Sequence, residues 1–363
     1  DPSCKLVTPY QGVKEHLKAL KKRSRGSRKA RDGAAGVLYA KGCDISGDDT
    51  SGFAEAVKVA EEADVVIAVL GLSTCNTPPP KGPKYCQEGE SHDRRVLGLP
   101  PIQQALLKQL VATKQPIVLV VMSGGPVVLD YATAVVHAII QAWYPGEEGG
   151  TALAEILYGL RSPSGRLPVS LPSDLDPPQG YLDMRMNRPP GKTYRYFTFQ
   201  PLYPFGFGLS YTKFSYQTTA NSWFVSSGVS REEVLTKGPR HLVRHSEGQT
   251  AVQISLVVSN VGSVDSHDVL QLYMSCASPS CARPEQWMSI PKQELKAFQK
   301  VWVPAGKSVT VTLTVELKDV RLFSERGFYE VIKGEYIVEV GGCPPMASAG
   351  PLPPPLRGLI VID

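Results

Sequence analysis

The sequence predicts two domains of different fold class: a doubly wound α/β layer with a mostly parallel sheet, followed by an all-β sandwich. Helical patterns alternate with short, continuous apolar runs through the first half, which is typical of strands buried on both faces of a parallel sheet. The second half contains strand patterns with no helical pattern between them. The length of 363 residues suits two domains, and a hydrophobic content of 42% suits a packed core.

The elements of the first half follow one another in the order that an α/β layer requires. Asp49-Thr50-Ser51 is able to cap a helix that begins at Phe53. The expected strands cover residues 64–71, 116–122 and 135–142, and the expected helices cover residues 53–63, 101–113 and 149–160. Ligands of such sheets bind at the carboxyl ends of the strands, so we expect a site in the loops that follow them.

Helical patterns stop after residue 160. Residues 161–211 are rich in Pro, Gly and aromatic residues, and we interpret them as a crossing between domains. Strand patterns then cover residues 250–260, 269–275, 307–315 and 334–340. We place the α/β domain at residues 1–172, a linker at 173–211, and the β-sandwich domain at 212–363, with a polar insert near 222–249.

The positive charge of the chain is concentrated in one short stretch. Seven basic residues lie there and exceed the whole net charge of +5: Lys21, Lys22, Arg23, Arg25, Arg28, Lys29 and Arg31. Ser and Gly interrupt the run, which favours a solvated loop over a nucleic-acid or heparin patch, and no aromatic residue is interleaved to stack on bases. The apolar runs are too short to span a bilayer. We therefore expect neither a nucleic-acid partner nor a membrane partner.

The seven cysteines suggest an oxidising compartment. Cys276 and Cys281 bracket one loop, and Cys75 and Cys86 bracket another, at spacings that suit loop-closing disulfides, although the sequence leaves the pairing open. We therefore expect an extracellular or lysosomal/secretory location. A zinc site at Cys75, Cys86 and His92 is the alternative, but the spacing matches no standard zinc pattern, so we expect no metal and no cofactor.

The loop after the strand at 64–71 concentrates polar chemistry. Its segment Gln87-Glu88-Gly89-Glu90-Ser91-His92-Asp93-Arg94 holds three acids, a His and an Arg in eight residues. A carboxyl group there can act as a general acid if its pKa is raised, and Asp93 and Arg94 are expected to pair and hold the loop. A solvated polar loop is the alternative. Ser123 precedes two glycines but lacks the Gly-x-Ser-x-Gly frame, which favours a turn at a strand end over a nucleophile.

These residues belong to a series of motifs, which runs in order as Glu90-x-x-Asp93-Arg94, Met122-Ser123-Gly124-Gly125-Pro126, Trp143-Tyr144-Pro145-Gly146, Gly165-Arg166-Leu167-Pro168, Asp183-Met184-Arg185-Met186, Gly191-Lys192-Thr193-Tyr194-Arg195-Tyr196 and Phe205-Gly206-x-Gly208. The series resembles the carboxyl-terminal part of glycoside hydrolase family 3, most nearly its β-xylosidase and α-arabinofuranosidase branch. The β-rich half, with Asp268-Val269-Leu270-Gln271-Leu272-Tyr273, resembles the fibronectin type III-like domain of that family.

The resemblance implies a retaining double displacement. The family carries an Asp nucleophile on a (β/α)8 barrel and the general acid/base on a loop of the α/β domain. By position in the motif, Glu90 matches the acid/base; Glu88 is the competing candidate, and the spacing to Asp93 and Arg94 favours Glu90. His92 and Tyr144 are further candidates to lie near the substrate.

The (β/α)8 barrel is absent from this chain, and the acidic stretch 44–49 does not replace its nucleophile. Because the first residue is Asp1 and not Met, we expect a processed form or part of a longer protein. The first hypothesis is the carboxyl-terminal part of an exo-acting β-glycosidase of xylan- or arabinan-type oligosaccharides, with the barrel supplied in cis or in trans. The second is a remnant that binds sugar or a protein partner without hydrolysis.

Overall fold

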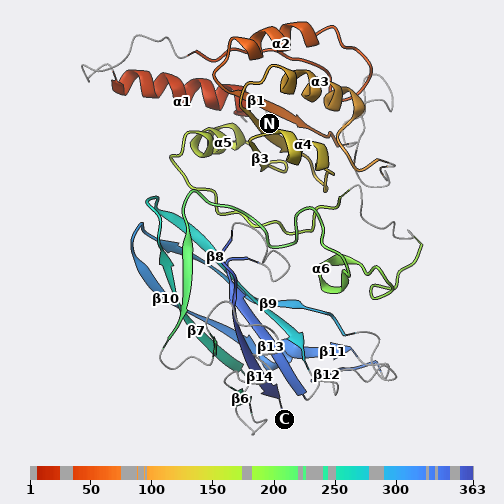
Figure 1. Cartoon of the computed structure of the whole chain (residues 1–363), viewed down its shortest axis with the longest axis vertical. Coiled ribbons are helices and arrows are strands. Elements are labelled where there is room, and N and C mark those ends of the chain that lie inside the picture. The colour runs from red at the N-terminus through yellow and green to blue at the C-terminus, as the bar shows by residue number, and fades with distance from the viewer. Residues whose placement is uncertain are drawn as a thin grey trace. The chain divides into compact units, whose positions relative to one another are not determined.

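The computed structural model describes residues 6–24, 36–74, 88, 94, 96–173, 182–219, 224–225, 240–243, 251–277, 290–323, 327–331, 334–343 and 352–362. The chain forms two compact units (Figure 1). Unit 1 comprises Asp1–Arg161 with Pro172–Asp174, and unit 2 comprises Ser162–Leu171 with Leu175–Asp363.

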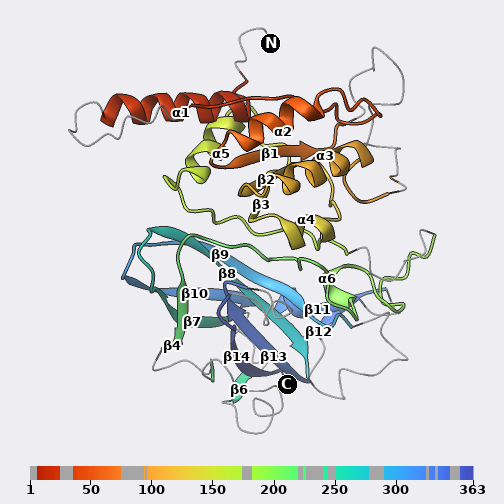
Figure 2. The ribbon, with the colours of Figure 1, turned by 45° about the horizontal axis from the view of Figure 1, so that its top comes forward.

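Unit 1 is built on a parallel sheet of three strands. β1 (Val66–Gly71), β2 (Ile117–Met122) and β3 (Ala138–Gln141) pair in that order, and all run in the same direction (Figure 2). Leu119, Val120 and Val121 of the central strand have no exposed surface, as expected for a strand covered on both faces. The predicted α/β class is therefore confirmed.

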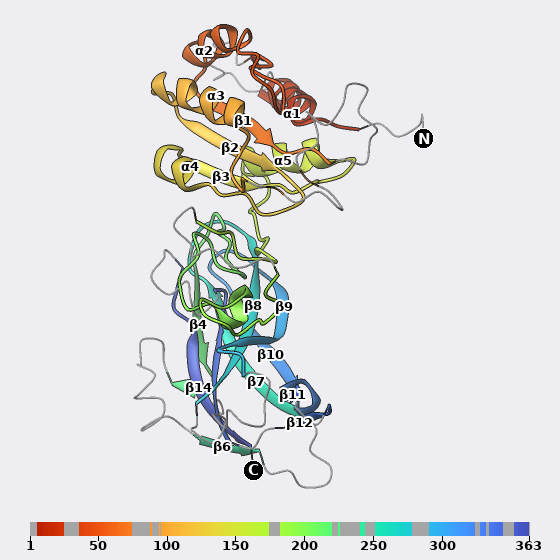
Figure 3. The same ribbon diagram turned by 90° about the vertical axis from the view of Figure 1, so that its right-hand side faces the viewer.

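Five helices of unit 1 lie within the described residues: α1 (Pro9–Ser24), α2 (Phe53–Glu61), α3 (Pro101–Ala112), α4 (Asp130–Val135) and α5 (Gly149–Leu157). Figure 3 shows α1 and α5 on one side of the sheet, and α2 and α3 on the other. α1 packs closely on α5 because each helix presents a glycine: a Cβ at Gly12 would overlap the Gly150 carbonyl, and a Cβ at Gly150 would overlap the Thr8 carbonyl.

Two local predictions in this unit need correction. The strand expected at 135–142 begins at Ala138, because residues 130–135 form the short helix α4. The basic run does not begin in a loop, since Lys21 and Lys22 lie in the last turns of α1. α1 itself starts at a capping box: the Gln11 amide N–H donates to the Thr8 hydroxyl oxygen, and the Gln11 side-chain oxygen accepts from the Thr8 amide at 2.9 Å.

Unit 2 is a β-sandwich, as predicted. One sheet has the order β10 (Ser308–Glu316), β7 (Ala251–Asn260), β4 (Phe214–Thr218). The larger sheet runs β5 (Phe224–Val225), β14 (Leu356–Ile362), β13 (Gly334–Gly341), β8 (Ser266–Cys276), β9 (Glu294–Val303), with β6 (Arg240–Val243) also paired to β14. A small hairpin joins β11 (Arg321–Phe323) to β12 (Tyr329–Val331) after a 3₁₀ turn at Leu317–Val320.

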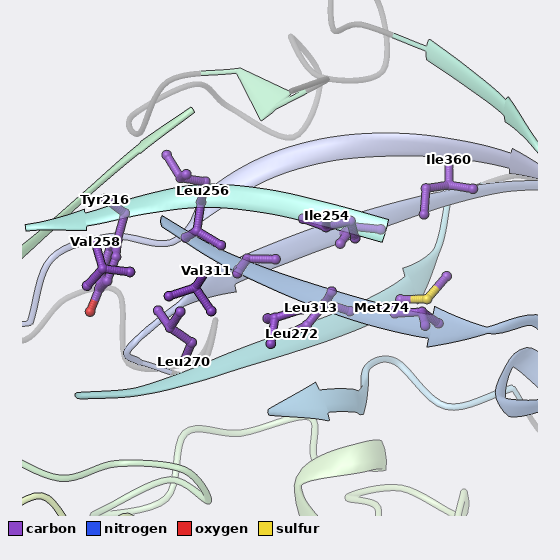
Figure 4. Close-up of a cluster of buried hydrophobic side chains, with 14 of the residues drawn as sticks. Tyr216, Ile254, Leu256, Val258, Leu270, Leu272, Met274, Val311, Leu313 and Ile360 are labelled. Atoms are coloured by element: carbon purple, nitrogen blue, oxygen red, sulfur yellow. The ribbon is translucent and has the colours of Figure 1, made fainter. Parts of the chain in front are cut away.

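The core of the sandwich lies between the two sheets. Ile254, Leu256 and Val258 of β7 face Leu270 and Leu272 of β8, and all five side chains are fully buried (Figure 4). The alternation read in residues 307–315 is also present, because Val311, Leu313 and Val315 are buried while the threonines between them are exposed.

The Pro- and Gly-rich crossing packs on this sandwich within unit 2. It contains the short helix α6 (Thr193–Tyr196). Tyr194 stacks on Phe205 at a centroid distance of 4.1 Å, and the Gln271 side chain of β8 donates to the Gly206 carbonyl at 2.9 Å. Gly206 has a φ of +82°, and a Cβ there would collide with Gln271 and Tyr273, so the position requires glycine.

Candidate functional site

The carboxyl ends of the three parallel strands of unit 1 meet at one edge of the sheet. Ser73 and Thr74 follow β1, the Ser123–Pro126 turn follows β2, and Tyr144 follows β3. Glu88 lies against this edge: its amide donates to the Ser73 carbonyl at 3.2 Å, and it forms a parallel bridge with Thr74. The edge is the place where the sequence predicted a site.

The Glu88 carboxylate is enclosed by hydrogen-bond donors. One oxygen accepts from the Gly124 amide and from the Tyr144 hydroxyl, and the other accepts from the Gly125 amide at 3.0 Å. Only 8% of Glu88 is exposed. The two glycines allow this approach, because a Cβ at Gly124 would lie 3.1 Å from one Glu88 oxygen and a Cβ at Gly125 would lie 3.4 Å from the other.

Arg94 binds the same Ser123–Pro126 turn, at a carbonyl group instead of the amide groups that bind Glu88. Its guanidinium donates to the Pro126 carbonyl, and more weakly to the Leu97 carbonyl at 3.4 Å. A Cβ at Gly125 would lie 3.4 Å from Nη2 of Arg94, so the guanidinium is close to the glycines that bind Glu88. Burial lowers the pKa of Arg94, and the charge of Glu88 acts in the opposite direction.

Tyr144 contributes a phenol to the edge while 43% of the residue stays exposed. Its hydroxyl donates to Glu88 and lies 3.2 Å from the Leu72 carbonyl oxygen. Burial raises the pKa of Tyr144, and the hydrogen bond to Glu88 and its charge raise it further, so the phenol stays a donor. The preceding Trp143 has a φ of +54°, a left-handed conformation that is unfavourable for a bulky residue and is concentrated at functional sites.

Ser123 supports the turn from inside. It has no exposed surface; its hydroxyl donates to the Gly125 carbonyl at 2.9 Å and accepts from the Gln141 side chain at 3.0 Å. A hydroxyl enclosed in this way suits a strand-end turn and not a nucleophile. Sequence reasoning did not single out Gln141, although a polar side chain at the end of the apolar strand β3 was a signal for it.

The predicted site residues fall into two groups. The structure brings Glu88, Arg94 and Tyr144 together around one turn. Glu90, His92 and Asp93 lie outside the described residues, so the pairing of Asp93 with Arg94 stays a prediction. In the sequence, Gly124 and Gly125 were noted only as part of a motif. The structure shows that their backbone amides donate to the Glu88 carboxylate.

The sequence predictions also concern metal ligands, membrane-spanning segments and cysteines. In the part of the chain that the structure describes, no three His, Cys, Asp or Glu residues are grouped so as to bind a metal, and no helix is both long and apolar enough to cross a membrane. Cys276 is disulfide-bonded, whereas Cys43 and Cys343 are free. Cys4, Cys75, Cys86 and Cys281 lie outside the described residues.

Both halves of the chain match known protein families. Residues 2–211 match the model of the glycosyl hydrolase family 3 C-terminal domain. The chain belongs to glycosyl hydrolase family 3. Residues 268–343 match the fibronectin type III-like domain, so the family predicted from the motifs is confirmed in both halves of this family 3 chain.

Relatives of this family 3 chain include enzymes of different specificity. The chain is 31% identical over 342 residues to a periplasmic β-glucosidase of Salmonella typhimurium, which covers 85% of this chain and 39% of the relative. It is 32% identical over 330 residues to a probable β-D-xylosidase 6 of Arabidopsis thaliana, with 84% and 39% covered.

A solved structure of the family superimposes on nearly the whole chain. It is a GH3 exo-β-xylosidase in complex with a xylobiose aziridine activity-based probe, with a TM-score of 0.71 and 25% identity over 99% of this chain and 42% of that chain. The chain thus spans about two fifths of the length of the relatives that it matches.

Proposed function

We propose that this chain is the carboxyl-terminal part of a retaining, exo-acting β-glycosidase and that it supplies the general acid/base, Glu90. One observation carries the proposal: Glu88 and Arg94, which flank Glu90 in the sequence, are both bound to the Ser123–Pro126 turn at the carboxyl edge of a parallel sheet. Two flanking anchors at this edge suit a catalytic loop better than a freely solvated one.

The chemistry needs two carboxyl groups about 5–5.5 Å apart across the sugar. In the first step Glu90 would donate its proton to the glycosidic oxygen while a carboxylate nucleophile bonds to the anomeric carbon. In the second step the Glu90 carboxylate would take a proton from the water that displaces the nucleophile. The nucleophile would be an Asp of a (β/α)8 barrel, supplied in cis or in trans, as the family resemblance implies.

The substrate class that we propose is a xylo- or arabino-oligosaccharide. The relatives of the chain support this choice, since they include a probable β-D-xylosidase and an exo-α-(1→6)-L-arabinopyranosidase. The β-glucosidase among them makes a glucoside the alternative. We also propose an extracellular or lysosomal/secretory location, which the disulfide at Cys276 supports because disulfides persist in oxidising compartments.

Hydrolysis of aryl glycosides by the longest gene product that contains this chain tests the proposal. We expect activity on aryl β-xylosides or α-arabinosides above that on β-glucosides. Glu90→Gln should lower kcat/KM by about 10²–10⁴-fold for leaving groups of high pKa, which need protonation, and much less for leaving groups of low pKa.

Glu62→Gln is the matched control, because Glu62 is exposed beyond the end of α2. It should leave kcat/KM unchanged. A gene product that hydrolyses these glycosides but is insensitive to Glu90→Gln would refute the acid/base assignment. A product that binds xylo-oligosaccharides in calorimetry but hydrolyses none of the aryl glycosides would instead establish the non-catalytic, sugar-binding hypothesis.

A further inference from the structure

We infer that Glu88 is a positioning residue for the proposed acid/base loop and not its proton donor: with Arg94, it fastens both ends of segment 88–94 to the Ser123–Pro126 turn. The inference rests on the proposed function, and it resolves the competition between Glu88 and Glu90 that the sequence left open.

The surroundings of Glu88 oppose a role as general acid. Both of its carboxylate oxygens accept hydrogen bonds, from the Gly124 amide, the Gly125 amide and the Tyr144 hydroxyl. An ionised carboxylate is an acceptor only, and three converging donors therefore suit the ionised form. To serve as the acid, Glu88 would have to hold a proton on an oxygen that already faces a donor, with 8% of the residue exposed.

The two anchors are chemically complementary to the turn that they bind. The turn offers amide donors at Gly124 and Gly125 and a carbonyl acceptor at Pro126. The anion Glu88 takes the donors, and the cation Arg94 takes the acceptor. Charge-assisted hydrogen bonds of this kind are stronger than neutral ones, so each anchor resists detachment.

Fixing both ends has a consequence for the residues between them. Five residues, 89–93, join the two anchors in the sequence, and Glu90 is among them. A segment with fixed ends loses less conformational entropy when it adopts one reactive arrangement than a segment with one free end. A misplacement of about 1 Å at a reacting group is able to cost 10²-fold in rate. Release of Glu88 should therefore reduce turnover without removing the proton donor.

Kinetics of single variants separate a positioning residue from a proton donor. In the longest gene product that contains this chain, Glu88→Gln turns one acceptor oxygen into an amide that faces the turn's N–H groups. We expect kcat on aryl β-xylosides with leaving groups of high pKa to fall about 10–100-fold, less than in Glu90→Gln, with KM changed less than about 2-fold. The fall of the rate at alkaline pH should be retained, because Glu90 is still present to donate the proton. In Glu90→Gln the fall of the rate at alkaline pH should disappear, because the proton donor is gone. Sodium azide, a nucleophile that needs no general base, should restore more activity to Glu90→Gln than to Glu88→Gln.

Tyr144→Phe provides a second variant in case Glu88→Gln unfolds the domain. It removes one of the three donors and leaves the turn intact, so kcat should fall by less than in Glu88→Gln. The double variant should be no slower than Glu88→Gln alone, because both changes act through one contact. A thermal unfolding curve shows whether each variant is still folded at the assay temperature.

Each outcome decides a separate point. A Glu88→Gln variant that loses the fall of the rate at alkaline pH, while Glu90→Gln retains it, would make Glu88 the acid/base and overturn the inference. A folded Glu88→Gln variant with unchanged kcat, even with a lowered Tm, would show a structural role alone and would also overturn it, while the proposed function stands. Absence of hydrolysis in the unsubstituted protein would refute the proposed function and this inference with it.

Discussion

The guanidinium of Arg166 donates to the carboxylate of Asp268 at 2.8 Å, and the two side chains are 9% and 0% exposed. Arg166 also donates to the Gly208 carbonyl, and Asp268 accepts from the Tyr216 hydroxyl at 2.8 Å. Burial raises the pKa of Tyr216 well above its ordinary value, and the charge of Asp268 adds to this, so the phenol remains a donor. The pair thus binds the crossing segment to strand β8 within unit 2.

Asp268→Asn should lower the free energy of unfolding of unit 2 by about 3–5 kcal/mol, because it leaves the Arg166 cation buried without its anion. Arg166→Met should have a similar cost. The double variant should cost less than the sum of the two, since it buries neither charge. Urea unfolding of the full chain measures these values, and strictly additive losses would contradict the expectation.

A surface ion pair is the control for this prediction. Arg161 pairs with Glu155, and the Arg161 side chain is 74% exposed. Arg161→Gln should change the free energy of unfolding by less than about 1 kcal/mol, because water already solvates the Arg161 charge.

Local sequence patterns predicted the fold class because they depend on neighbouring residues. The runs at 64–71 and 116–122 are continuous and β-branched, and both form parallel strands. The prediction failed where two elements follow each other without a turn residue: no Gly or Pro between residues 130 and 142 marks the change from α4 to β3. α1 was missed although Thr8 and Gln11 carry a capping-box pattern with Pro9 between them.

The candidate site was predicted in place but not in detail. Parallel strand order alone puts the loop ends at one edge, and Glu88 of the acidic segment lies there. The three partners of Glu88 are 36, 37 and 56 residues away in the sequence, after the ends of β2 and β3. Which oxygen meets which donor depends on tertiary packing, and no local pattern reports it. Glu88 was therefore a candidate proton donor in the sequence and an enclosed acceptor in the structure.

Gln103 is expected to be essential for the end of β1. Its side-chain oxygen accepts from the Gly71 amide at 2.8 Å, and its side-chain nitrogen donates to the carbonyls of Gly71 and Ile45, each at 2.7 Å. Gln103→Glu replaces the donor by an oxygen that faces two carbonyl oxygens. The free energy of unfolding of unit 1 should fall by about 2–3 kcal/mol at pH 7, as measured by chemical denaturation.

Gln109→Glu is the matched control in the same helix, because Gln109 is exposed. It should change stability by less than about 0.5 kcal/mol. Equal effects at the two positions would show that the hydrogen bonds of the Gln103 side chain to the Gly71 backbone contribute nothing to stability.

Gly12→Ala should destabilise unit 1 even though alanine favours helix formation. The substitution gains about 1 kcal/mol of helix propensity in α1. The added Cβ would overlap the Gly150 carbonyl of α5, however, and backbone atoms cannot rotate away as a side chain can. Overpacking of this kind costs about 1–3 kcal/mol or more, so we expect a net fall in Tm. Gly165→Ala, where a Cβ meets no atom within 4 Å, is the control. A raised Tm for Gly12→Ala would contradict the close approach of the two helices.

Cys343 should make the stability of unit 2 decline at alkaline pH. Only 1% of the residue is exposed, and burial raises the pKa of its thiol from 9.0 to about 12. Between these values the unfolded state releases a proton that the folded state keeps, so the contribution is complete below pH 9 and is lost as the pH rises. At pH 10 the loss amounts to about 1.4 kcal/mol, one pKa unit. Cys343→Ala removes this titration but not the others in the chain. The stability difference between the unsubstituted protein and the variant should therefore shrink by that amount between pH 8 and pH 10, and a constant difference would show that the thiol titrates normally.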